Sequence, residues 1–281
     1  MAKRILIQAI IALCFSTSLY AETISFVNEN VKALCLANWD TDKDGELSTE
    51  EAEAVTTLGE VFRGKKNIGC FPELRYFTGL TTIAEYAFSG SSIGPEIVIP
   101  GNVKQLEAYC FSDCQQLNRV ILEEGVESVG YDAFFGPVVY LSLPATLTYI
   151  ASTAINPYVN AYPGSGVFVP KGDLTVQVHS EIPATIDNYA FYYVFGEAHL
   201  VVPQGCKEAY KSSSPWSHFY EYLEMGDVND DGYMDITDVT ALIAYVTGQD
   251  PKPFKPAAAD INGDGLVDAN DVDALCRLLL Q

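Results

Sequence analysis

Residues 83–100, IAEYAFSGSSIGPEIVIP, contain the two patterns that decide the fold. The first is an aliphatic residue, Ile83, followed four positions later by a small residue and Phe88. The second is a β-branched run that ends at Pro100. Ile and Val favour β-strands and Pro ends them, so the segment predicts one compact turn followed by one short strand.

This unit recurs through the middle of the chain. Phe88, Phe111 and Phe134 are 23 residues apart, a degraded copy lies at residues 154–155, and a later copy ends at Phe191. The strands predicted for the copies are residues 96–100, 119–123, 140–144, 166–170 and 199–203. A unit of this size cannot bury a core alone, whereas stacked copies can, so the sequence predicts a repeat solenoid with one short β-strand per coil.

The repeat pattern resembles a known family. An Ile-x-x-x-Ala-Phe segment, then a polar link, then Ile-x-Ile-Pro, is similar to the leucine-rich repeats of BspA-like bacterial surface proteins. The resemblance covers residues 67–222, with an irregular stretch at 145–185, and residues 201–210 followed by Trp216 resemble the terminal cap of such arrays. It implies a leucine-rich repeat solenoid with a surface for a protein or glycan ligand.

Three acidic loops lie outside the repeats, one starting at Asp40 and two starting at Asp227 and Asp260. Each loop has acidic or amide side chains at positions 1, 3 and 5, Gly at position 6 and an acid at position 12. The predicted ligand residues are Asp40, Asp42, Asp44, Glu46, Glu51, Asp227, Asn229, Asp231, Tyr233, Asp235, Asp238, Asp260, Asn262, Asp264, Leu266, Asp268 and Asp271.

Oxygen atoms at this spacing converge on one hard cation when the chain curls, and Gly at position 6 permits the sharp bend. The residues at position 7, Glu46, Tyr233 and Leu266, would contribute backbone carbonyl oxygens. His and Cys are absent from the ligand positions, which favours calcium over zinc. We therefore expect three structural calcium sites. The alternatives are three acidic turns that bind no ion and sites that act as calcium sensors.

Each C-terminal loop precedes a stripe of apolar residues at helical spacing, which predicts a buried helix face. The stripes are Val239, Leu242, Ile243 and Val246, then Val272, Leu275, Cys276 and Leu279. We therefore expect a small all-α helix-loop-helix module at residues 226–281. A second such module is expected at residues 22–66, where the loop starting at Asp40 lies between two predicted helices. The N-terminal module resembles a single EF-hand and is expected to cap the open end of the solenoid.

The paired C-terminal loops, with Asp at position 12, resemble a type I dockerin module. The resemblance implies a cohesin-like partner that contacts loop positions 10, 11, 17 and 18 of both halves. In this chain these residues are Ile236, Thr237, Ile243, Ala244, Ala269, Asn270, Cys276 and Arg277. The alternative for these eight residues is simple packing or a solvated helix face.

Residues 1–21 have the features of a signal peptide: Lys3 and Arg4, a short apolar run, and small residues ending at Ala21. We expect a secreted or cell-surface bacterial protein, with an apolar run too short for membrane insertion. The net charge of -21 argues against nucleic-acid binding, because phosphate contacts need Lys and Arg. Six cysteines follow residue 21, and we expect most of them to be buried free thiols.

No familiar catalytic motif is recognisable, and the clustered acids are assigned to the calcium loops. We predict a non-catalytic binding protein, with a ligand surface on the solenoid and a calcium-dependent module that attaches to a cohesin-like partner. Two alternatives stay open: an accessory component of a polysaccharide-degrading complex that contributes to glycoside hydrolysis, and a structural adhesion element. Two roles stay open for Tyr158, Tyr162, Tyr189, Tyr192 and Tyr193: an aromatic patch that binds a ligand, or filling of the wider and capping coils.

Overall fold

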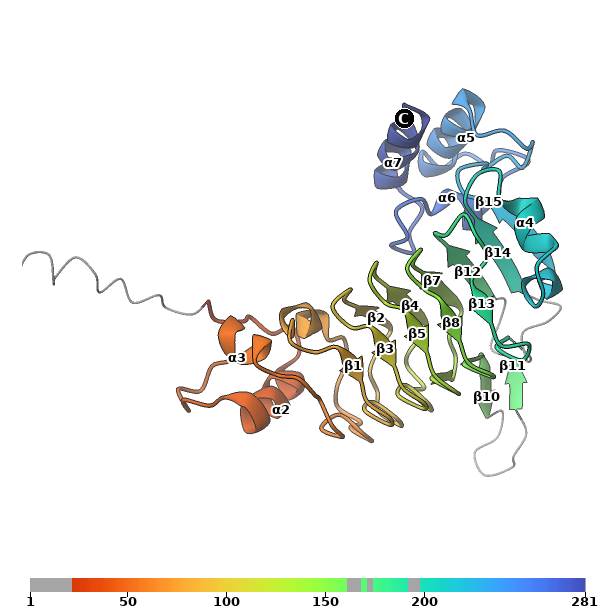
Figure 1. The fold of residues 1–281 in the computed structure, drawn as a ribbon. Coiled ribbons are helices and arrows are strands. Elements are labelled where there is room, and N and C mark those ends of the chain that lie inside the picture. Colours follow the sequence, from red (N-terminus) through yellow and green to blue (C-terminus); the bar gives the residue numbers. More distant parts are fainter. Residues whose placement is uncertain (1–21, 161–167, 171–173, 192–197, 281) are drawn as a thin grey trace, which may run out of the picture.

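The computed structural model describes residues 22–160, 168–170, 174–191 and 198–280. It shows a β-solenoid with a small helical unit at each end, which confirms the predicted fold class (Figure 1). The predicted signal peptide lies outside the described residues, as do Tyr162, Tyr192 and Tyr193. None of the helices in the described ranges is both long and apolar enough to cross a membrane.

Two parallel sheets run along the solenoid. The larger sheet has six strands in the order β15-β14-β12-β7-β4-β2. Their bounds are β2 Glu96–Ile99, β4 Arg119–Leu122, β7 Tyr140–Leu143, β12 Leu174–Val178, β14 Ala198–Val202 and β15 Glu221–Glu224. In β2 and β4, residues alternate between half-buried and buried, so one face of each strand packs into the core and the other forms the outer face of the sheet.

The smaller sheet consists of two-residue strands on another side of the coils. These strands are β1 Thr82–Ile83, β3 Gln105–Leu106, β5 Ser128–Val129, β8 Tyr149–Ile150 and β13 Thr185–Ile186, and a separate pair is formed by β6 Phe134–Phe135 and β9 Ile155–Asn156. Each strand pairs in parallel with the equivalent strand of the next coil, so successive coils stack directly.

The strand predicted at residues 166–170 forms in its described part, but its predicted place as a repeat strand is wrong. Its described part, β11 Phe168–Pro170, pairs antiparallel with β10 Tyr158–Asn160, outside the six-stranded sheet. The place in the sheet belongs to β12, which pairs with β7 and β14 and buries Leu174 and Val176. The β10–β11 hairpin is inserted between two coils and carries the same strand-like composition as a coil, which explains the misassignment.

A ladder of stacked phenylalanines forms the centre of the solenoid core. The ring centroids are 4.9 Å apart between Phe88 and Phe111 and 5.5 Å apart between Phe111 and Phe134. Phe62, which precedes the first coil, stacks on Phe88 at 4.9 Å. The N-terminal unit, with α2 Glu29–Trp39 and α3 Thr49–Glu53, therefore shares one continuous core with the solenoid, next to the 3-10 helix η1 Pro72–Tyr76.

The C-terminal end carries two short helical segments, α4 Lys207–Lys211 and η2 Trp216–His218, and then the separate unit formed by α5 Ile236–Val246, α6 Pro256–Ala259 and α7 Ala269–Leu279. This unit has its own small core around Leu242 and Leu275. The apolar stripes are confirmed for Val239, Leu242 and Leu275, which are buried. The prediction for Ile243 as a buried residue is wrong, since 45% of it is exposed.

The six cysteines of the described ranges are free. Cys35, Cys110 and Cys114 are buried. Burial raises the pKa of the Cys114 thiol to about 11, and Cys114 donates its S–H to the carbonyl oxygen of Phe88. Cys110 and Cys114 pack as small hydrophobic residues inside the coils, and Cys35 does so inside the N-terminal unit. Cys70, Cys206 and Cys276 are half-buried, so the expected burial holds for three of the six cysteines in the described ranges.

Candidate calcium loops and partner surface

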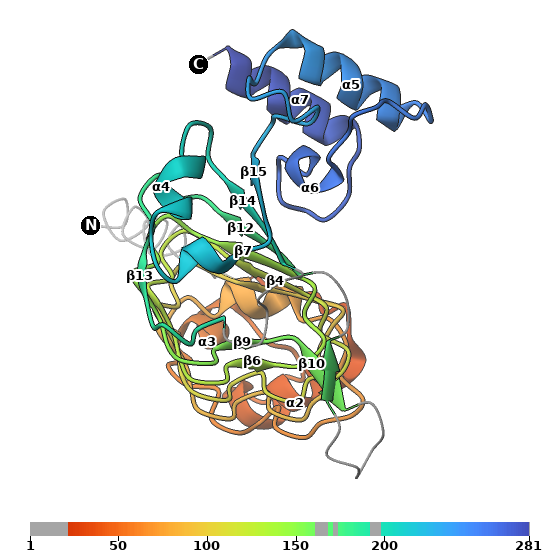
Figure 2. The same cartoon turned by 90° about the vertical axis from the view of Figure 1, so that its right-hand side faces the viewer.

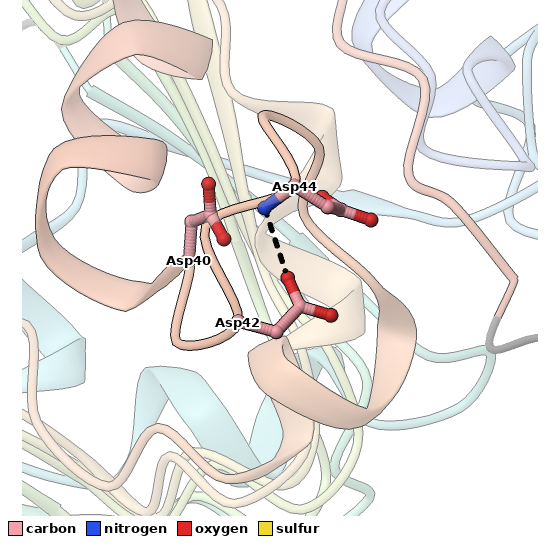
Figure 3. Close-up of side chains that lie close together, drawn as sticks. All are labelled: Asp40, Asp42 and Asp44. Carbon is pink, nitrogen blue, oxygen red and sulfur yellow. Dashed lines mark hydrogen bonds between the residues drawn. The ribbon is translucent and has the colours of Figure 1, made fainter.

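The N-terminal loop brings the carboxylates of Asp40, Asp42 and Asp44 together. One oxygen from each lies within 4.8 Å of the others, and Figure 3 shows the three side chains around the curled backbone. The backbone N–H of Asp44 donates to Asp42 Oδ1 at 3.1 Å, and that of Gly45 donates to Asp40 Oδ2 at 3.1 Å. Gly45 has φ of 89°, so the bend needs the glycine predicted at position 6.

Glu51, at position 12, closes this loop. Its two oxygens accept hydrogen bonds from the backbone N–H of Thr41 at 2.6 Å and of Ser48 at 3.0 Å. Burial alone would raise the pKa of Glu51, but the hydrogen bonds from Ser48 and Thr41 outweigh it and lower the pKa to about 2. Glu51 therefore stays ionised at any ordinary pH. The side chain of Glu46 pairs with Lys32 at 2.9 Å, which leaves its backbone carbonyl as the predicted ligand.

The first C-terminal loop has the same hydrogen-bond pattern. Both oxygens of Asp227 accept backbone N–H groups, from Asp231 at 3.0 Å and from Gly232 at 2.9 Å. Asn229 Oδ1 accepts from the Asp231 N–H at 2.9 Å. The Tyr233 side chain is 72% exposed, as expected for a residue that would contribute its carbonyl oxygen.

The second C-terminal loop repeats this pattern with one difference. The Gly265 N–H donates to Asp260 Oδ2 at 2.9 Å, and the Asp264 N–H donates to Asn262 Oδ1 at 2.8 Å. The Leu266 side chain points outward and is 63% exposed. Asp260 Oδ1, in contrast, is buried and has no hydrogen-bond partner in the described structure.

The acids at positions 9 and 12 also begin the helices that follow. Asp235 and Asp268 are the N-caps of α5 and α7, and in each case the position-12 acid completes a capping box. The Asp235 N–H donates to Asp238 Oδ2 at 2.8 Å, and the Asp268 N–H donates to Asp271 Oδ2 at 2.9 Å. The predicted ligands therefore have a second role, which the sequence interpretation missed although the S/T/D-x-x-D/E spacing carries the signal.

The residues of both C-terminal loops fit a calcium ion. Each loop buries two acids, Asp227 with Asp238 and Asp260 with Asp271. Burial raises the pKa of Asp238 and of Asp260, the latter despite a nearby arginine. A cation would stabilise buried carboxylates of this kind, and Asp260 Oδ1, which has no hydrogen-bond partner in the described structure, is an oxygen available to bind one. Calcium would supply this charge and tie the loop to its helix.

The predicted partner residues lie along α5 and α7. Ile236 is 70% exposed, and Arg277 is exposed and forms an ion pair with Asp273 at 2.7 Å. Cys276 is half-buried against the module core. The exposed members are Ile236, Thr237, Ile243, Ala269, Asn270 and Arg277, and the half-buried ones are Ala244 and Cys276. Of the predicted aromatic patch, the structure describes the side chain of Tyr189, which is 56% exposed.

The sequence interpretation missed the contacts that hold the C-terminal module on the solenoid. Arg119 of β4 reaches Asp260 Oδ2 at 3.4 Å, across 141 residues of sequence. Lys255 pairs with Glu221 of β15 at 2.5 Å. A cavity of about 750 Å³ lies between these two contacts. The sequence did show a basic residue, Arg119, in a predicted repeat strand, but no neighbouring residue indicates that its partner is Asp260.

Comparison with protein families finds two matches. Residues 60–158 match the BspA type leucine rich repeat region in six copies, and residues 225–280 match the dockerin type I domain. No curated protein matches the chain. Leucine-rich repeat regions and dockerin domains are both non-catalytic module types. Type I dockerins are calcium-binding domains that bind cohesins. The chain therefore combines a BspA-type leucine-rich repeat region with a C-terminal type I dockerin domain.

Proposed function

We propose that this is a secreted, non-catalytic binding protein. Its dockerin domain attaches to a cohesin-like partner in a calcium-dependent way, while the solenoid presents a surface for a protein or glycan ligand. The combination of a leucine-rich repeat region and a dockerin supports a protein-interaction role within a larger extracellular assembly.

The observation that carries this proposal is the orientation of the dockerin domain. Ala258 of α6 packs with Val201 and Leu223 of the six-stranded sheet. Figures 1 and 2 both show α6 next to the sheet and α5 and α7 beyond it. The exposed partner residues are on α5 and α7, so a partner can reach these helices while the domain stays seated on the solenoid.

Calcium would act on the partner surface through the capping boxes. Asp238 and Asp271 are fully buried at the junction between each loop and its helix. A cation in the loop would neutralise these acids and fix the first turn of α5 and α7, where Ile236 and Ala269 lie. Without a cation, repulsion between the buried carboxylates would loosen both helices and the surface that they form.

The outer face of the solenoid sheet also favours binding over catalysis. Glu96 pairs with Arg119 at 3.0 Å, and Glu221 pairs with Lys255 and with His199 at 2.8 Å. Burial alone would raise the pKa of Glu221, but its hydrogen bonds from Lys255 and His199 lower it. The partners of Glu221 thus hold this carboxylate ionised, whereas a general acid needs a raised pKa.

The test is binding of the full chain to a panel of immobilised cohesin domains, in calcium and in chelator, by surface plasmon resonance. We expect binding in calcium only. Ile236→Arg and Ala269→Arg, which place a charge on the exposed faces, are expected to weaken it about tenfold or more.

The matched control is Lys252→Ala. Lys252 is an exposed residue of the same domain that pairs with exposed Asp250, at 2.9 Å, and lies outside α5 and α7. The Lys252→Ala variant should bind the cohesin domains as tightly as the unmodified chain does. If no cohesin is captured while circular dichroism shows that calcium still folds the domain, the docking role is wrong.

A further inference from the structure

A solenoid side chain is inserted against the second calcium loop. The Arg119 guanidinium donates to the Gly263 carbonyl oxygen and lies 3.4 Å from Asp260 Oδ2. Its Nε is 3.0 Å from Glu96, and its central carbon is 3.6 Å from the ring centre of Tyr140. Only 14% of the Arg119 side chain is exposed, so the cation is fixed between the sheet and the loop.

The fit against the loop is tight. A Cβ atom added at Gly265 would lie 2.4 Å from a terminal nitrogen of Arg119, so any larger residue at this position would force the guanidinium to move. The glycine that the loop requires for its bend thus also opens the loop to a side chain from the solenoid.

The first loop differs in this respect. Both oxygens of Asp227 are taken by amides of its own loop, and none of the ion pairs in the described ranges reaches Asp227. The nearest cations, Lys207 and Lys255, instead approach Asp230 at 3.6 and 3.8 Å. Asp230 is at loop position 4, which is not a ligand position.

The charge of the second loop determines how strongly Arg119 is held. The loop contains four acids, Asp260, Asp264, Asp268 and Asp271, and the guanidinium forms an ion pair with the first of them. A bound Ca²⁺ would cancel two of these negative charges and would itself repel the guanidinium. Docking of the loop on Arg119 is therefore most favourable when the loop holds no calcium. Linkage requires the reciprocal effect, in which docking lowers the affinity of the loop for calcium.

We propose that Arg119 makes the second loop the weaker of the two dockerin calcium sites, and that calcium binding there loosens the dockerin domain from the solenoid sheet. This inference rests on the proposed calcium binding by the dockerin loops. Loosening would uncover the outer face of β4 and β7, including Tyr140, which is buried under the domain and donates to Gln177 at 2.6 Å. Calcium concentration would then set how much of the sheet is open to a solenoid ligand.

The test is a calcium titration of the full chain labelled with ¹⁵N-glycine, followed by NMR. Gly232 and Gly265 each donate a backbone N–H to the position-1 acid of their own loop, so each amide reports on one site. In the unmodified chain, the Gly265 signal should saturate at a higher calcium concentration than the Gly232 signal. In Arg119→Gln, the Gly265 midpoint should fall about fivefold while the Gly232 midpoint stays the same.

Two further variants support the assignment. Glu96→Gln removes the other anion that holds Arg119, so it should shift the guanidinium toward the loop and raise the Gly265 midpoint. Arg75→Gln is the matched control, because Arg75 also lies over a tyrosine ring, Tyr76, at 5.0 Å, but belongs to η1, which precedes the first strand of the solenoid. It should change neither midpoint.

The outcomes separate the two proposals. If both glycine signals respond to calcium but Arg119→Gln leaves the Gly265 midpoint unchanged or raises it, the regulation by Arg119 is wrong and calcium binding stands. If the Gly265 signal does not respond to calcium in any of the proteins, calcium binding by the second loop and its regulation are both wrong.

Discussion

The two ends of the molecule carry the same kind of calcium-type loop but are attached in different ways. The N-terminal unit buries Val31, Cys35 and Leu47 in the same core as the repeats, whereas the dockerin domain buries Leu242 and Leu275 in a core of its own. The comparison shows that the loop does not decide whether such a unit is a fixed cap or a separate domain. Whether the unit shares the solenoid core or has its own core depends on the apolar residues of the helices beside the loop.

The contacts across each junction follow from this difference. At the N-terminal end, Phe62 continues the phenylalanine ladder of the coils and also lies 5.2 Å from Phe71. At the C-terminal end, a small apolar contact around Ala258 is flanked by the ion pairs of Arg119 and Lys255. Polar contacts of this kind are weaker and more easily reversed than a shared core, which suits an attachment domain.

The largest effect is expected at the shared core. Phe62→Ala removes a fully buried ring that stacks on Phe88, and it should destabilise the cap and the solenoid together by about 3–5 kcal/mol. Urea unfolding followed by circular dichroism would measure this change. A separate early transition of the cap, with the solenoid unaffected, would contradict the shared core.

A somewhat smaller and local effect is expected in the dockerin. Leu242→Ala should destabilise that domain by about 2–5 kcal/mol, because Leu242 is fully buried in the separate core. The solenoid transition should keep its midpoint in the same urea experiment. An equal shift of both transitions would mean that the two units unfold as one.

The sequence predicted the parts of the molecule that depend on local spacing. The repeat of Phe88, Phe111 and Phe134 predicted the solenoid, since stacking requires equal intervals. The strand at residues 166–170 was wrongly assigned to the repeat, because an inserted hairpin has the same residue preferences as a coil strand.

The junctions could not be read from the sequence. Ile243 fitted a buried stripe by periodicity, yet it is exposed, because an apolar residue at a helix edge can be turned to either side by tertiary packing. The contact of Arg119 with Asp260 joins residues 141 positions apart. Sequence spacing carries no information on such a pair.

The smallest effect is expected at the ion pair of Lys255 with Glu221. The pKa of Glu221 is lowered from its ordinary 4.5, so the stabilisation it provides is present above that value and is lost as the pH falls below it. We expect less than about 1 kcal/mol, because both side chains are partly exposed. Glu221→Gln should reproduce the loss at pH 7.

The dockerin transition in urea between pH 7 and pH 3.5, compared with Glu221→Gln, measures this contribution. The difference between the two proteins should shrink as the pH falls. A difference that stays constant over the whole range would show that the charge of Glu221 contributes nothing to the junction.

The most direct test of the account is hydrogen–deuterium exchange of the full chain in calcium and in chelator. The separate core of the dockerin predicts that amides of α5 and α7 lose protection when calcium is removed. Amides of α2 and of the six-stranded sheet should keep most of their protection, because the solenoid core holds the N-terminal cap in place. Equal loss of protection in α2 and in α7 would contradict the distinction between a fixed cap and a calcium-held domain.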